Sequence, residues 1–283
     1  MVQPSFNSRR VLILESRRAR ELALLVGTYG GEPIVAPAMR EVPLESNTEA
    51  MAFADALDRG EFDMVVLLTG VGTRALVEVM ERSRGGRDAF VAALGRTTIA
   101  ARGPKPVAAL RELGLTPWLT APEPNTWKEL LAALDSRAGE KPLRGLRLAV
   151  QEYGASNPDL LAGLEARGAS VTRVPVYRWA LPEDLEPLRA GIRRLVAGDV
   201  DVVFLTTATQ VVHVLEVAGA MGLRESVLAA VQRTVVASIG PTTSEELRGH
   251  GIFVDIEPSR PKMGFLAREA AEQSEALLKA KRP

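Results

Sequence analysis

The sequence of 283 residues contains no cysteine and only two histidines, His213 and His250. Without cysteine the chain forms no disulfide, no thiol nucleophile and no thiolate-bound zinc or iron–sulfur centre. Two histidines are too few for a metal site with three histidine ligands. The composition therefore predicts no metal site of these common kinds.

An excess charge and a long apolar run are also missing. The 35 basic residues are balanced by 35 acidic ones, so no general electrostatic attraction to nucleic acid or to an anionic membrane is expected. No segment approaches the roughly 18 apolar residues of a membrane span, and residues 11–14 are too short for a signal-peptide core. We expect a soluble cytoplasmic protein that holds any anionic ligand by local geometry.

Short apolar runs alternate along the chain with segments of helical periodicity. Residues 11–14, 64–68 and 97–101 are continuous runs of β-branched or aliphatic residues, each followed by a turn and a helical pattern. Continuous runs indicate strands that are buried on both faces, as in a parallel sheet covered by helices. The predicted class is α/β, with doubly wound parallel sheets.

The sequence also repeats itself at a nearly constant spacing. Residues 63–66 match residues 201–204 at an offset of 138, and residues 11–15 match 148–152 at 137. The Gly-Pro turns at 103 and 240 are 137 residues apart. This spacing predicts an internal duplication of one α/β module. Taken alone, the repeat divides the chain near residue 146.

Proline-bounded segments occur at matching places in the two copies. Residues 36–44 and 174–182 read as extended linker strands, because proline disfavours helix at the preceding residue. They could lie side by side as an interdomain connection. The C-terminal segment, residues 270–283, reads as a solvated helix that frays.

Residues 70–75, Gly-Val-Gly-Thr-Arg-Ala, fit a dinucleotide-binding fingerprint directly after a strand. The acidic residue that this motif needs is missing, because the next strand ends at Ala101 and Arg102. The equivalent turn of the second copy, residues 206–209, has no glycine. An ordinary strand-to-helix turn is favoured, and a nucleotide-dependent enzyme remains a third possibility.

Two Gly-Pro turns are more informative: Gly103-Pro104-Lys105 and Gly240-Pro241-Thr242-Thr243. Proline suits the first position of a helix, and free N–H groups at a helix start can hold a carboxylate or a phosphate. Arg102 adds charge to the first turn, and the threonines add hydroxyl donors. Simple capping would explain either turn alone. Because the turn occurs twice, each time at the carboxyl end of a strand, ligand binding and simple capping are equally good explanations.

Several other polar residues are candidates for a role. Thr69-Gly70 and Thr206-Thr207 form a second pair of polar turns, which alone indicate capping. Tyr177, in the second linker, has a hydroxyl that can donate a proton, although packing beside Trp179 is the simpler explanation. Neither histidine is assigned a catalytic role. These residues predict a cleft between the two domains, lined by helix N-termini and hydroxyls and suited to an anionic ligand.

Taken together, the motifs resemble the uroporphyrinogen-III synthase family over residues 11 to about 271. The resemblance is carried by Ile-Gly-Pro-Thr-Thr at 239–243, Gly-Pro-Lys at 103–105, Val-Pro-Val-Tyr-Arg at 174–178 and residues 201–206. It implies two flavodoxin-like domains joined by a two-stranded linker. One domain would hold residues 1–38 and 179–283, and the other residues 42–175, with linker strands 36–44 and 174–182.

The resemblance also implies a reaction. Linear hydroxymethylbilane, which carries eight carboxylates, would lose its hydroxyl as water to give an azafulvene. The azafulvene carbon would attack ring D at its substituted position, and the spiro intermediate would reclose with ring D inverted, as uroporphyrinogen III. The family needs neither metal nor cofactor. The protein would be a monomer that receives its substrate by hand-over from hydroxymethylbilane synthase.

Matching positions imply roles for individual residues. Tyr177 would assist departure of the hydroxyl as a donor or acid. Substrate carboxylates would meet the following residues: Gly240, Pro241, Thr242, Thr243, Thr206 and Thr207 in one domain, and Thr69, Gly70, Arg102, Gly103 and Pro104 in the other.

The sequence departs from the family at four places. Members often have Ser-Pro where this chain has Thr69-Gly70 and Thr206-Thr207-Ala208, and an Arg-Gly turn where it has residues 151–154. Residues 261–264 replace a helix start led by threonine. These departures leave open a regulatory or ligand-binding paralogue that binds a tetrapyrrole-like molecule without catalysis.

Overall fold

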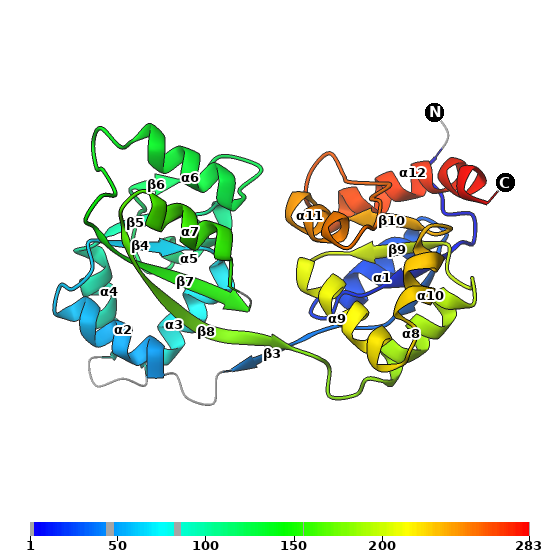
Figure 1. The fold of residues 1–283 in the computed structure, drawn as a ribbon, viewed down its shortest axis with the longest axis horizontal. Coiled ribbons are helices and arrows are strands. Elements are labelled where there is room, and N and C mark those ends of the chain that lie inside the picture. The colour runs from blue at the N-terminus through cyan, green and yellow to red at the C-terminus, as the bar shows by residue number, and fades with distance from the viewer. Residues whose placement is uncertain (1–2, 44–47, 82–85, 155, 283) are drawn as a thin grey trace. The chain divides into compact units, whose positions relative to one another are not determined.

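The computed structural model describes residues 3–43, 48–81, 86–154 and 156–282. Side chains of Pro43, Tyr153 and Tyr177 lie outside the described part. Contacts divide the chain into two units (Figure 1). Unit 1 comprises Met1–Arg40 and Ala180–Pro283, and unit 2 comprises Glu41–Trp179.

The sheet of unit 1 has four parallel strands in the order β10-β9-β1-β2. They are β1 (Arg10–Ile13), β2 (Glu32–Val35), β9 (Val202–Leu205) and β10 (Val235–Ser238). An isolated parallel bridge between Ala237 and Ile256 extends the sheet beyond β10. This is the flavodoxin-like order, in which the connections change direction between β1 and β9. Open α/β sheets bind ligands at this switch point, beyond the carboxyl ends of the strands.

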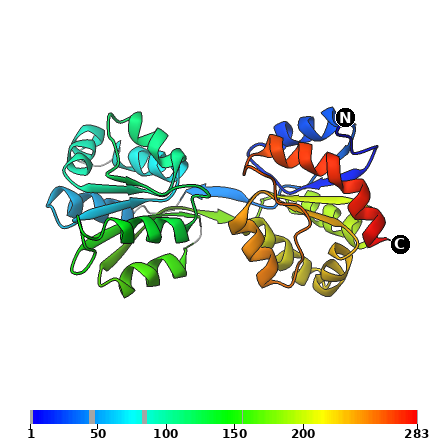
Figure 2. The same cartoon turned by 90° about the horizontal axis from the view of Figure 1, so that it is seen from above.

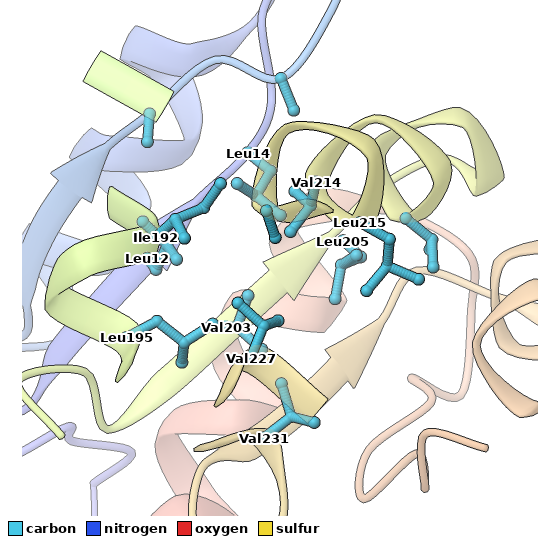
Figure 3. Packing of buried hydrophobic residues seen from close by; sticks show 14 of the residues in the cluster. Leu12, Leu14, Ile192, Leu195, Val203, Leu205, Val214, Leu215, Val227 and Val231 are labelled. Atoms are coloured by element: carbon cyan, nitrogen blue, oxygen red, sulfur yellow. The ribbon is translucent and has the colours of Figure 1, made fainter. Parts of the chain in front are cut away.

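Helices cover both faces of the unit 1 sheet (Figure 2). One face, where Leu12 and Val203 point, packs against α8 (Glu186–Val196), α9 (Ala208–Ala220), α10 (Arg224–Val231) and α11 (Pro241–Gly249). Figure 3 shows the aliphatic side chains that meet there. The other face, where Val11 and Phe204 point, packs against α1 (Ala19–Thr28) and α12 (Met263–Lys281). The prediction of a doubly wound sheet is confirmed here.

The sheet of unit 2 has six strands in the order β3-β8-β7-β4-β5-β6. They are β3 (Arg40–Pro43), β4 (Met64–Leu67), β5 (Thr98–Ala101), β6 (Leu119–Thr120), β7 (Arg147–Gly154) and β8 (Ser170–Ala180). Strands β8-β7-β4-β5-β6 are parallel and repeat the order of unit 1, with the switch point between β7 and β4. The proline-bounded segments supply β3 and β8, which are neighbours in the sheet (Figure 1).

Helices also cover both faces of the unit 2 sheet. One face packs against α2 (Thr48–Asp58), α3 (Gly70–Glu81), α4 (Gly86–Gly95) and α5 (Pro104–Arg111). The other packs against α6 (Trp127–Ser136) and α7 (Pro158–Ala166). Helix α6 begins with a capping box in which Thr126 and Glu129 each accept a backbone N–H, which satisfies donors at the helix start.

The predicted duplication is visible element by element. Strands β1, β9 and β10 of unit 1 correspond to β7, β4 and β5 of unit 2, and the bridge at Ile256 corresponds to β6. Helices α2 and α8 begin 138 residues apart, and so do α3 and α9. Both sheets therefore present the same set of helix starts beyond their carboxyl ends.

The prediction of a helix at the C-terminus was right, but the prediction that it is solvated and frays was wrong. Helix α12 continues to Lys281, and its Ala270, Ala271, Ser274 and Leu278 are buried. These residues recur every three or four positions and so form one apolar face, which small side chains make difficult to recognise. Although α12 has 19 residues, no helix within the described ranges is both long and apolar enough to cross a membrane.

Candidate functional site

The switch point of unit 1 holds a polar chain formed by Gln210, Thr206 and Glu15. Gln210 is fully buried, and its amide donates from Nε2 to Thr206 Oγ1 at 2.9 Å and accepts from Thr206 N at 2.7 Å. The Thr206 hydroxyl donates to Glu15 Oε2, and Arg18 N donates to Glu15 Oε1 at 3.2 Å. The single hydroxyl proton of Thr206 is thereby used within the protein, so Thr206 is not a ready donor to a carboxylate ligand.

Thr207 and Thr69 occupy equivalent positions and cap helices. Thr207 Oγ1 accepts from Gln210 N at 3.3 Å at the start of α9, and Thr69 Oγ1 accepts from Gly72 N at 3.0 Å at the start of α3. Capping uses the oxygen of each hydroxyl and leaves its proton. The Thr207 proton points to Met39 Sδ at 3.4 Å, whereas Thr69 donates to no described residue. Thr69 is therefore the better ligand donor of the two.

The predicted Gly-Pro turn at Gly240 starts α11 and is supported from below by two serines. Ser238 and Ser244 are fully buried. Ser238 Oγ donates to Gly240 O at 3.1 Å, and Ser244 Oγ lies 2.9 Å from Ser238 Oγ. Ser244 also donates to Glu257 Oε2 at 2.5 Å. Sequence reasoning missed this network, although Ser238 could have been noticed as the polar end of an apolar strand.

Helix α11 presents donors beyond the sheet. Pro241 has no N–H, so Thr242 and Thr243 supply the first N–H groups of the helix, which have no partner within it. Thr242 is exposed and Thr243 is 3% exposed. Neither hydroxyl makes a hydrogen bond within the described residues. This arrangement can accept an anionic oxygen.

The two glycines of the dinucleotide-like motif serve packing. Helix α3 begins at Gly70, so Gly70, Val71 and Gly72 form its first turn instead of the expected loop. A Cβ at Gly70 would lie 2.4 Å from Lys105 O, and one at Gly72 would lie 2.1 Å from Gln151 Nε2. Close packing accounts for both glycines, and the nucleotide-dependent enzyme finds no support here.

Gln151 occupies the switch point of unit 2. Its side chain is 1% exposed, and Nε2 donates to Glu152 O at 2.6 Å. The acceptor Oε1 is buried and has no hydrogen-bond partner among the described residues. The neighbouring Glu152, 4% exposed, accepts from Ser156 Oγ at 2.7 Å and from Arg173 Nε at 3.0 Å.

Arg102 follows β5 at the same edge of unit 2. Its backbone N–H donates to Leu67 O at 3.0 Å. The half-buried guanidinium has no partner among the described residues, and burial lowers its pKa. Partial burial of an unpaired cation is costly. The side chain is therefore poised to receive an anion.

Gly103 and Pro104 start α5 beside Arg102. A Cβ at Gly103 would lie 2.7 Å from Asn125 Oδ1, so glycine makes room for this amide, a neighbour that sequence reasoning missed. Pro104 and Pro106 have no N–H, and α5 consequently offers fewer backbone donors than α11. At this edge the charge of Arg102 is the main attraction for an anion.

The remaining sequence predictions have mixed outcomes. The backbone of Tyr177 lies in β8, but its side chain is outside the described part, so its role stays a prediction. His213 is a buried helix residue whose Nδ1 lies 2.8 Å from Ala38 O. His250 follows the end of α11 and contacts Glu246 Oε1 at 3.0 Å. Both histidines thus have structural partners.

A family model described as "Uroporphyrinogen-III synthase HemD" matches residues 20–268. The chain belongs to this family. The resemblance inferred from the Gly-Pro turns and the linker motif is thereby confirmed, as is the two-domain α/β fold.

Two curated relatives match most of this chain. A protein of Methanothermobacter thermautotrophicus called "Putative uroporphyrinogen-III synthase" is 30% identical over 247 residues, covering 86% of this chain and 89% of the relative. The "Uncharacterized protein YjjA" of Bacillus subtilis is 31% identical over 271 residues, covering 94% and 96%.

Solved structures show the same fold. A mutant uroporphyrinogen III synthase from the extremely thermophilic bacterium Thermus thermophilus is 26% identical, with a TM-score of 0.73 and coverage of 95% of this chain and 100% of that one. The Helicobacter pylori synthetase is 15% identical with a TM-score of 0.51, covering 95% and 99%, and supports the fold alone.

Proposed function

We propose that this chain is an active uroporphyrinogen-III synthase, which converts hydroxymethylbilane to uroporphyrinogen III and water. The proposal rests on family membership together with one observation in particular. Arg102 is a half-buried guanidinium at a strand end with no partner in the part of the chain that the structure describes, and α/β folds bind ligands at such strand ends. A substrate with eight carboxylates would supply the missing counter-charge.

Substrate binding would use local donors at the two carboxyl edges. Arg102 and the Thr69 hydroxyl are available in unit 2, and the N–H groups and hydroxyls of Thr242 and Thr243 in unit 1. Charge-assisted hydrogen bonds from such groups to carboxylates are stronger than neutral ones. A chain with zero net charge can thus hold a polyanion.

The proposed reaction needs control of geometry more than a strong acid or base. Loss of the hydroxyl as water creates a reactive carbon that can close on ring D in two ways. Holding the substrate carboxylates at fixed donors would select the conformer that attacks the substituted position, which is a gain from proximity and orientation. We propose that Tyr177 assists departure of the hydroxyl as a donor or acid.

A non-catalytic paralogue that binds a tetrapyrrole-like ligand is the second candidate. It is favoured by Gln151, whose amide fills the space above Gly72 at the unit 2 switch point, in a segment that departs from the family pattern. The two candidates predict different products from hydroxymethylbilane.

The test is to incubate the purified chain with hydroxymethylbilane and to resolve the isomers after oxidation to porphyrins. Type III product above the level of a protein-free control supports the synthase. Type I product alone, together with substrate-dependent quenching of tryptophan fluorescence, would point to the paralogue. The same reaction with Tyr177→Phe tests the tyrosine, because an unchanged type III rate would exclude its role.

A further inference from the structure

We propose that the Glu15 carboxylate stabilises the positive charge that develops on the substrate as its hydroxyl leaves. This inference rests on the proposed synthase function. It assigns a task to a buried acidic group that neither the family motifs nor the substrate-binding residues include.

Glu15 is a buried carboxylate without a cationic partner among the described residues. The residue is 9% exposed, and its oxygens accept from Arg18 N and from the Thr206 hydroxyl. The Arg18 guanidinium is turned to Glu21, with Nε at 2.7 Å from Glu21 Oε2. In the described part of the chain, no lysine or arginine side chain forms an ion pair with Glu15.

The duplicated copy shows what a structural carboxylate at this position looks like. Glu152 is the equivalent residue of unit 2, and Arg173 binds it through Nε at 3.0 Å and Nη2 at 2.9 Å. Arg173 lies opposite Val150 in the β7–β8 pair, just as Val35 lies opposite Ile13 in the β1–β2 pair. Unit 1 thus retains the carboxylate and has valine in place of the cation.

A buried carboxylate that lacks a cation is unfavourable for folding, so its presence calls for another explanation. Glu15 follows β1 and contacts Thr206, which follows β9, at the switch point where such sheets bind ligands. A fixed negative charge at that place favours a ligand that carries or acquires positive charge.

The proposed reaction produces such a ligand. The C–O bond of the hydroxymethyl group breaks, its electron pair leaves with oxygen, and that oxygen takes up a proton and departs as water. The pyrrole nitrogen donates electron density to the carbon, and the ring becomes an azafulvenium cation. The proton consumed is returned when the closed macrocycle loses one. A nearby carboxylate lowers the energy of the cation more than that of the neutral substrate.

The carboxyl edges of the two sheets consequently differ in the sign of the charge that they present. Unit 2 presents the unpaired Arg102, and unit 1 presents Glu15 without a cation. Arg102 would bind the substrate carboxylates, which are charged throughout the reaction. Glu15 would stabilise the pyrrole ring, which becomes positively charged only during the reaction. A substitution at Glu15 should therefore affect turnover, whereas one at Arg102 should affect binding.

The experiment compares Glu15→Gln, Glu15→Asp and the matched control Glu152→Gln with the wild-type chain. Initial rates of type III formation are measured over a range of hydroxymethylbilane concentrations, and folding is checked by circular dichroism. We expect Glu15→Gln to lower kcat at least about tenfold with KM within about twofold, a loss typical of a transition-state interaction. Glu15→Asp should recover part of kcat, because it restores the charge.

Glu152→Gln should keep the wild-type kcat, because the carboxylate of Glu152 forms an ion pair with Arg173. Glutamine is nearly isosteric with glutamate. Its Oε1 can accept from Arg18 N and its Nε2 can donate to the Thr206 hydroxyl oxygen, so a merely structural Glu15 would tolerate it. A wild-type kcat in folded Glu15→Gln would overturn the inference while leaving the synthase function intact. If Glu15→Gln does not fold, Glu15→Asp decides instead: a lowered kcat for type III formation that stays above the protein-free rate, with KM within about twofold, supports the inference, whereas loss of all type III formation, or a raised KM with a wild-type kcat, overturns it. Type I product alone from the wild-type chain would overturn both proposals.

Discussion

Arg10 donates two hydrogen bonds to one carboxylate oxygen of Asp201, from its backbone N–H at 2.9 Å and from Nε at 3.1 Å. Arg147 and Asp63 repeat this contact in unit 2, at 2.8 Å and 3.1 Å. Both pairs join the amino ends of neighbouring parallel strands. The duplication thus extends from the strand order to individual side-chain contacts, and it provides matched pairs of positions for experiments.

The first prediction compares the two acidic partners. The Asp201 side chain is 11% exposed and also bonds Arg282, whereas the Asp63 side chain is 34% exposed. Burial would raise the Asp201 pKa, but the bonds from Arg10 and Arg282 outweigh it and lower the pKa. We expect Asp201→Asn to cost about 2–3 kcal/mol, as for a buried bond between charged groups. Solvent screening should reduce the cost of Asp63→Asn to about 1 kcal/mol or less. Urea unfolding measures both, and the reverse order would contradict this explanation.

The second prediction concerns the stability of the fold at low pH. The side-chain bond from Arg147 is the largest cause that lowers the pKa of Asp63. A carboxyl group with a lowered pKa in the folded state contributes stability above its unfolded pKa of about 3.9, and this contribution is lost as the pH falls through the folded value. The difference in unfolding free energy between wild type and Asp63→Asn should be constant from pH 7 to 5 and should shrink below about pH 4. A difference that grows in acid would disprove this assignment.

The third prediction tests the unpaired guanidinium. Arg102→Met removes the charge and keeps the length of the side chain. We expect KM for hydroxymethylbilane to rise about tenfold or more, as for a lost charge-assisted hydrogen bond, with little change in kcat. Stability should not fall, because the guanidinium has no partner among the residues that the structure describes.

Arg111→Met is the matched control for Arg102, because Arg111 is exposed at the end of α5, the helix that begins two residues after Arg102. Steady-state rates of both variants, measured over a range of hydroxymethylbilane concentrations, show whether Arg102 binds the substrate. Equal KM values for Arg102→Met and Arg111→Met would remove Arg102 from the binding site.

The fourth prediction concerns a difference between the two cores. In unit 2 the Phe53 ring contacts Phe62 and Phe90, with centroids at 5.4 Å and 6.2 Å. The equivalent positions of unit 1 carry Gly191, Val200 and Val227. Unit 1 has an apolar cavity of about 30 Å³ lined by Val227 and by aliphatic residues of β1, β9 and β10 (Figure 3). Of the three equivalent positions, Val227 lines this cavity.

Val227→Ile adds one methylene group beside that cavity. We expect a gain of about 0.5–1 kcal/mol, since burial of one CH₂ contributes about 0.8 kcal/mol. Val212→Ile is the control, because Val212 is 44% exposed on α9 and the same addition there stays in solvent. A midpoint in urea for Val227→Ile that does not exceed that of Val212→Ile would show that the cavity cannot be filled in this way.

Much of the architecture follows from local patterns. Continuous apolar runs such as residues 64–68 predicted the parallel strands, and proline after glycine predicted the starts of α5 and α11. The repeat alone divides the chain near residue 146, whereas contacts place Met1–Arg40 with Ala180–Pro283. Both copies contain similar strands, so their local pattern does not reveal which strands pair across the chain.

The candidate site was harder to predict for the same reason. The Thr206 hydroxyl bonds Glu15, 191 residues away, and this contact removes the donor that the sequence suggested. Arg102 was predicted from its place beside a Gly-Pro turn. The structure shows no partner for its guanidinium among the described residues. This depends on which side chains the fold brings close to Arg102, and no sequence pattern predicts that.

The isomer ratio of the product decides whether this chain is a synthase. The wild-type chain, added to fresh hydroxymethylbilane, should yield uroporphyrinogen III in large excess over type I, with the rate proportional to the amount of protein. Liquid chromatography of the oxidised porphyrins measures both isomers against a protein-free control. Type I in the proportion given by the control would contradict the proposal that this chain is a synthase.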